Sequence, residues 1–128
     1  MRYVLIVMLL FSASAQAEDW ESFGPENSYY SKSDTQFNLL ERTISVKMLT
    51  DNFQGASAVQ YFQFRCADGK PVKERSLYML RHEGLMGTGN RSILDAGGPW
   101  MPFRSLRFQH LLDAWCKAIE DNRNSLFK

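Results

Sequence analysis

Apolar and polar residues alternate along several short runs of this chain, a period of two that predicts strands with one buried and one wet face. The clearest run covers residues 42–50, and its alternate apolar positions are Ile44, Val46 and Met48. A second run, 59–66, is rich in aromatic residues and places Cys66 on the face shared by Phe62 and Phe64. Weaker runs lie at 20–23, 29–30, 76–83 and 91–94.

The period changes near the C-terminus, where one apolar stripe recurs at helical spacing. Its members are Phe108, Leu111, Leu112, Trp115 and Ile119. This stripe predicts a helix from Ser105, a residue type that commonly caps helix N-termini, to about Glu120. The polar residues 121–125 are expected to fray.

Sequential strands followed by a single helix are typical of an α+β fold, in which one helix packs on one face of an antiparallel sheet. Glycine- and proline-containing segments at 24–27, 68–71, 84–89 and 97–99 supply the turns. We expect one domain over residues 18–128, because its 111 residues are close to the commonest domain size.

Residues 1–17 have the composition of a secretory signal peptide. Arg2 precedes an apolar run from Val4 to Phe11, and the small residues that follow end in Ala15-Gln16-Ala17, an A-x-A cleavage pattern. The apolar run is shorter than the ~20 residues of a membrane-spanning helix, so we predict cleavage before Glu18 and no membrane span. The expected location is the periplasm or the cell exterior.

Charge gives little indication of a partner. The chain has 15 basic and 14 acidic residues, and loss of Arg2 with the leader would leave the charges balanced. A balanced charge argues against a dedicated nucleic-acid binder, which usually has a basic excess. Five arginines could still gather into an anion-binding patch, although intervening acidic residues favour a mixed, solvated surface. They are Arg75, Arg81, Arg91, Arg104 and Arg107.

The only cysteines, Cys66 and Cys116, are predicted to form a disulfide. Export to an oxidising compartment favours this reading over a reactive thiol or metal site, because neither C-x-x-C spacing nor a neighbouring cysteine–histidine cluster accompanies them. With Cys66 ending a strand and Cys116 beside the helical stripe, the bond would tie the helix to the sheet.

Several segments, in order along the chain, resemble the bacterial surface-adhesin E family. They are Trp20, the extended run 41–51, Phe64-Arg65-Cys66, Met86-Gly87-Thr88-Gly89, Trp100-Met101-Pro102 and Ala114-Trp115-Cys116. The resemblance implies an antiparallel sheet of about six strands with a C-terminal helix tied to it by the disulfide. It also implies a non-enzymatic binding domain whose partner is another protein, such as a host matrix protein. A periplasmic protein is the alternative partner. Unlike the lipoprotein adhesin, this chain has no cysteine after the predicted cleavage site, so no lipid anchor is expected.

No catalytic motif is present, and we predict that the protein is not an enzyme. The alternative function is haem or metal binding, which the family resemblance also suggests, with His82 and His110 as the candidate ligands. Each histidine is isolated in its predicted strand or helix, so a surface or hydrogen-bonded role is the simpler reading and no cofactor is predicted. The glycine-rich segment 84–89 lacks the lysine of a phosphate-binding loop and is interpreted as a turn.

Overall fold

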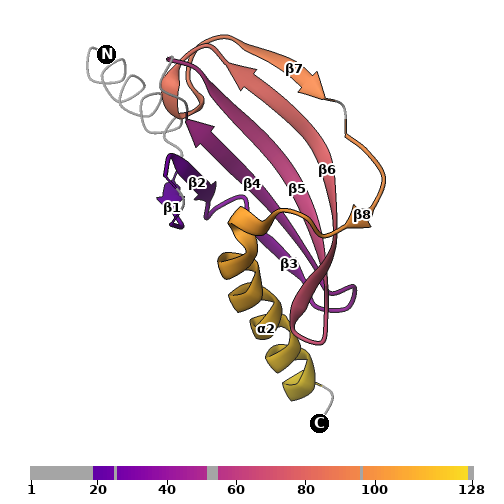
Figure 1. Ribbon diagram of the computed structural model, residues 1–128. Coiled ribbons are helices and arrows are strands. Elements are labelled where there is room, and N and C mark those ends of the chain that lie inside the picture. The colour runs from indigo at the N-terminus through magenta and orange to yellow at the C-terminus, as the bar shows by residue number, and fades with distance from the viewer. Residues whose placement is uncertain (1–18, 25, 52–54, 96, 127–128) are drawn as a thin grey trace, which may run out of the picture.

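Eight strands form one antiparallel sheet in the computed structural model, which describes residues 19–24, 26–51, 55–95 and 97–126 (Figure 1). The hydrogen-bonded order is β1-β2-β4-β5-β6-β7, and in addition β3 pairs with β4 and β8 pairs with β6. Figure 1 shows α2 lying across one face of this sheet. The predicted leader, residues 1–17, and its cleavage point before Glu18 lie outside the described residues.

The strands are β1 (Trp20–Ser22), β2 (Ser28–Ser31), β3 (Gln36–Asn38), β4 (Thr43–Asp51), β5 (Ser57–Ala67), β6 (Lys70–His82), β7 (Arg91–Asp95) and β8 (Met101–Pro102). The helical segments are the 3₁₀ turns η1 (Leu85–Gly87) and η2 (Leu106–Phe108) and the helix α2 (Gln109–Leu126). The predicted α+β class, with an antiparallel sheet and one C-terminal helix, is confirmed.

The central hairpin is longer than the sequence pattern predicts. β6 begins at Lys70, because Asp68 and Gly69 alone make the turn after β5, with left-handed φ angles of 52° and 77°. Two positive φ angles in a two-residue loop match the twist of the flanking strands. β3 and β8 are the short strands that the alternation does not reveal.

The core lies between α2 and the sheet, and it uses the apolar positions that the alternation marks. Its buried residues are Ile44, Val46, Met48, Phe62, Phe64, Cys66, Phe108, Leu112, Cys116 and Ile119. On the flank, Trp115 packs edge-on against Tyr30 and Phe37, with ring centroids 5.2 and 5.7 Å apart. The helical stripe is therefore the face that packs on β4 and β5.

Both ends of the predicted helix need correction. The first turn after Ser105 is the 3₁₀ turn η2, and the Ser105 hydroxyl does not cap it but donates to Oε2 of Glu74, 2.8 Å away. At the other end the helix continues to Leu126 instead of fraying. Arg123 supports the last turns by donating from Nη1 to the backbone oxygens of Leu39 and Leu40.

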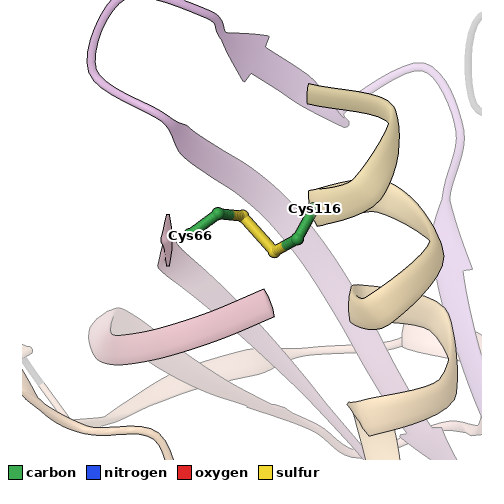
Figure 2. Close-up of a disulfide and its surroundings, with 2 residues drawn as sticks. All are labelled: Cys66 and Cys116. Atoms are coloured by element: carbon green, nitrogen blue, oxygen red, sulfur yellow. A yellow bond between two sulfur atoms is a disulfide. The ribbon is translucent and has the colours of Figure 1, made fainter. Parts of the chain in front are cut away.

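The disulfide joins the end of β5 to the middle of α2 (Figure 2). Cys66 and Cys116 have an S–S distance of 2.08 Å and a Cα–Cα distance of 5.5 Å. Both residues are buried in the core. The predicted bond is thus present, and it fastens the helix to one face of the sheet.

Within the described part of the chain, no helix combines the length and apolar character needed to cross a membrane.

Candidate functional site

The sheet face turned away from α2, called the open face below, carries the candidate site. Strand alternation places Lys47, Tyr61 and Tyr78 on this face, opposite to the core positions, and the register makes them cross-strand neighbours on β4, β5 and β6. The next row along the same strands consists of Ser45, Gln63 and Arg75. The same alternation that builds the core therefore builds a polar and aromatic surface behind it.

Lys47 occupies an aromatic environment in the first row. Its Nζ lies 5.4 Å from the ring centroid of Trp20 and 5.6 Å from that of Tyr61, within the range of cation–π attraction. Asp34 pairs with the same ammonium at 3.5 Å. The side chain of Lys47 is only 14% exposed, so this cation is held by its neighbours.

Tyr61 and Tyr78 extend the aromatic surface towards the edge of the sheet. Their rings stack, with centroids 4.3 Å apart and planes inclined by 24°. Desolvation, followed by a hydrogen bond with Tyr61, raises the pKa of Tyr78 above its ordinary value. The Tyr78 phenol therefore stays neutral, and able to donate a hydrogen bond, well beyond physiological pH.

Trp100 forms a second cluster, because it lies against two guanidinium groups. The central carbons of Arg65 and Arg75 are each 4.6 Å from the centroid of the Trp100 ring. Arg75 is further fixed by donating from Nε to Oε1 of Gln63, 2.8 Å away. We call Arg65, Arg75 and Trp100 the arginine–tryptophan cluster.

Gly97 positions Trp100 by allowing the chain to pass close to a bulge in β6 at Leu77. Gly98 donates its N–H to the backbone oxygen of Ser76, at 3.0 Å. Gly97 has a φ of 100°, and a Cβ added there would collide with the backbone oxygen of Leu77. A larger residue at 97 would push residues 97–100 away from the sheet.

The charge of the open face is positive. Lys47 has Asp34 as a partner, whereas no carboxylate in the described part of the chain forms a salt bridge with Arg65 or Arg75. An arginine stacked on an aromatic ring keeps the N–H groups at its edge free to bind a carboxylate. The cluster is thus suited to an anion that approaches along the ring plane.

A row of serine, aspartate and histidine lies at the far end of the same face. Asp51, Ser57 and His82 are adjacent in register on β4, β5 and β6. Ser57 is 2% exposed; its Oγ donates to the backbone oxygen of Gly84 and accepts from the N–H of Gly87. The carboxylate of Asp51 accepts from the N–H of Met86 at 2.6 Å, a further tie to the same loop.

This row anchors a loop and does not form a nucleophilic triad. A triad needs the histidine between the serine and the carboxylate, whereas here Ser57 lies between the other two. The anchored segment, 84–89, closes over the small apolar cluster of Leu49, Val59 and Leu80. The predicted turn is a loop that contains η1, and its glycines allow backbone segments of the loop to pass close to each other.

The two candidate histidine ligands are not brought together. His82 is 9% exposed on the open face, and its Nδ1 is buried with no hydrogen-bond partner among the described residues. His110 is exposed on α2, the helix that covers the opposite face. Within the described ranges, no group of three or more histidine, cysteine, aspartate or glutamate side chains is arranged as a metal site.

The five arginines considered as a patch are divided by the fold. Arg75 and Arg91 occupy open-face positions, while Arg81 alternates to the other face of β6. Arg107 donates to Oγ of Ser28 beside the start of the helix. The sequence did not predict that Arg75 contacts Trp100 together with Arg65. The two arginines are placed by the register of β5 and β6, and Trp100 is placed by the path of residues 97–100, which has no periodic pattern.

Comparison of the chain with protein-family models, with curated proteins and with solved structures gave no match. The fold and the site define the class of protein as a disulfide-tied α+β domain with a cationic, aromatic sheet face.

Proposed function

We propose that the protein is an exported, non-enzymatic interaction domain that binds an acidic protein partner through its open face. The observation that carries the proposal is the arginine–tryptophan cluster, in which Trp100 lies against both Arg65 and Arg75 on the face that α2 leaves uncovered. None of these three side chains belongs to the apolar core. Their arrangement is therefore better explained by binding than by packing.

Physical chemistry favours an acidic protein segment as the partner. Tryptophan, tyrosine and arginine are the residue types that most often dominate binding energy at protein interfaces. Two guanidinium groups without an internal carboxylate partner offer bidentate hydrogen bonds to aspartate or glutamate side chains. Because Gln63 and Trp100 hold Arg75 in place, little side-chain entropy is lost when the anion binds.

The predicted leader and the disulfide support export to an oxidising compartment, the periplasm or the cell exterior. The segments that resemble the surface-adhesin E family, and that follow one another in the same order along the chain, support an adhesion-type or other protein-binding role. A protein that binds its partner outside the cytoplasm benefits from the covalent tie between helix and sheet, because the bond constrains the unfolded chain and so stabilises the folded domain.

The test measures binding of a fluorescent polyglutamate peptide to the purified protein by anisotropy at low and at physiological salt. We expect Arg75→Gln to weaken binding by about tenfold, the usual effect of losing one charge-assisted contact at an interface. Arg81→Gln is the matched control, because it removes the same charge from the same strand on the other face. Equal losses for both variants, or no binding by the wild type, would contradict the proposal.

A further inference from the structure

A groove of about 640 Å³ lies on the open face where β7 pairs with β6. Leu80 follows Tyr78 by two positions on β6, and Ile93 of β7 is the cross-strand partner of Leu80, so all three side chains are on the face turned away from α2. The groove is lined by Leu77, Tyr78, Leu80, Arg91, Ser92 and Ile93. Only Arg91 among them is charged. A concave and mostly apolar surface with few polar groups is the usual form of a binding site.

The apolar side chains of the groove are exposed at its rim and buried at its floor. Ile93 is 72% exposed, and Leu77 and Tyr78 are each 36% exposed, although all three are large apolar or aromatic residues. Leu80 is 8% exposed and forms the floor. An apolar group placed in the groove would therefore remove much of this surface from water, which is the main favourable contribution in most associations.

A cation lies at each end of the groove. Arg91 is at one end, as the cross-strand partner of His82. Arg75 of the arginine–tryptophan cluster is at the other end, one row of the sheet beyond Tyr78. No acidic residue lines the groove, and no described carboxylate forms a salt bridge with Arg75 or Arg91. Charge complementarity therefore favours an occupant that is apolar in the middle and anionic at both ends.

The register of β5 gives the distance between these two cations, because β5 is regular where β6 bulges. Arg75 lies in the row of Gln63, and Arg91 lies in the row of Ser57. Gln63 and Ser57 are six positions apart on β5, which corresponds to about 20 Å at roughly 3.3 Å per residue. An extended peptide has the same rise, and its alternate side chains face the same way. Such a peptide would therefore match the four rows of the open face with every second side chain.

We propose that the groove binds an extended segment of the acidic partner, with an acidic residue at each end and two apolar residues between them, all at alternate positions. The two acidic residues would face the arginine–tryptophan cluster and Arg91. The two apolar residues would lie on Tyr78 and on the pair formed by Leu80 and Ile93. The pattern rests on the acidic protein partner proposed above and adds the spacing by which that partner is recognised.

Two fluorescent heptapeptides of identical composition test the spacing by anisotropy. They are Glu-Ser-Leu-Ser-Leu-Ser-Glu and Glu-Leu-Ser-Ser-Ser-Leu-Glu. In the second, the leucines point away from the groove when both glutamates face the arginines, so we expect the first to bind at least about tenfold more tightly. Ile93→Ser should weaken the first peptide about fivefold and leave polyglutamate binding unchanged. Leu94→Ser is the matched control, because Leu94 is 56% exposed on the same strand but does not line the groove.

A peptide with one glutamate, Glu-Ser-Leu-Ser-Leu-Ser-Gln, tests the second cation. Arg91→Gln should weaken the peptide with two glutamates about tenfold and this one less than about twofold, because a single carboxylate should occupy the cluster with two guanidinium groups. Equal affinities for the two leucine arrangements, or an equal effect of Arg91→Gln on both peptides, would overturn the spacing pattern. The acidic partner would stand in either case if polyglutamate still binds. Failure of polyglutamate and of every heptapeptide to bind would overturn both proposals.

Discussion

Replacing both cysteines tests how much the disulfide stabilises the fold. Cys66 and Cys116 are 50 residues apart in sequence. In the chain-entropy model, closing a loop of this length lowers the entropy of the unfolded state by the equivalent of about 4 kcal/mol at 25 °C. Both residues are buried, so alanines at these positions would also leave a small unfilled volume in the core. We expect Cys66→Ala/Cys116→Ala to lose at least about 4 kcal/mol of unfolding free energy.

The assay is guanidinium unfolding at 25 °C, followed by tryptophan fluorescence and far-ultraviolet circular dichroism. Reduced and alkylated wild-type protein is the companion sample, because it also lacks the bond but keeps the native sequence. Since small domains are stable by only ~5–15 kcal/mol, the expected loss moves the midpoint far enough to be unmistakable. A loss below about 1 kcal/mol would refute the reasoning. It would mean that the unfolded chain is already compact, so that the disulfide removes little of its entropy.

Three further predictions concern the supports of the site and the pH range of the fold. In thermal unfolding, Gly97→Ala should lower stability by more than about 2 kcal/mol. Gly98→Ala, whose added Cβ meets nothing within 4 Å, should be nearly neutral in that assay. Glu74 accepts hydrogen bonds from the N–H and hydroxyl of Ser105, at 2.9 and 2.8 Å. In urea unfolding, Glu74→Gln should therefore lower the unfolding free energy by about 1–2 kcal/mol, whereas the control Glu83→Gln, at an exposed position, should leave it unchanged. Desolvation tends to raise the pKa of Asp19, but hydrogen bonds from Ser33 and Ser31 outweigh it and hold the pKa below its ordinary value. This support of β1 is present above pH about 4 and lost on further acidification, so the protection factor of the Ser33 amide, which is its exchange rate relative to that of an unprotected amide at the same pH, should fall there. A protection factor that does not change with pH would contradict this, as would an Asp19→Asn variant with the same pH response.

The sequence was sufficient for the parts of the fold that follow from local periodicity. Ile44, Val46 and Met48 lie on one face of β4 because a strand alternates, and the helical stripe packs on them because it is the only apolar face of α2. The disulfide followed from the same logic, since Cys66 shares its face with Phe64 and Cys116 adjoins the stripe. These features depend on neighbours in sequence, which a single chain displays directly.

The missed features depend on contacts between residues distant in sequence. Helix capping failed at Ser105 because Glu74, about thirty residues earlier, competes for its hydroxyl. The helix end was wrong for a similar reason, since Arg123 binds backbone oxygens of residues 39 and 40. The arginine–tryptophan cluster likewise needs the β5–β6 register and the path of residues 97–100, neither of which has a periodic signal.

The disulfide and Glu74 together hold α2 on the core side of the sheet, which leaves the open face uncovered. Cys116 fixes the middle of α2 to β5, and Glu74 fixes the backbone at Arg104 and Ser105 just before the helix begins. With two attachments on one side of the sheet, α2 cannot shift to cover the other side without breaking a covalent bond or leaving a carboxylate without its donors. The cationic surface therefore remains uncovered because α2 is attached to the other side of the sheet. We predict that Cys66→Ala/Cys116→Ala, which removes one of these attachments, lowers the unfolding free energy but changes peptide affinity little as long as the domain stays folded. Anisotropy measured well below the unfolding midpoint checks this prediction, and a parallel loss of affinity in fully folded protein would show that the helix contributes to the binding surface itself.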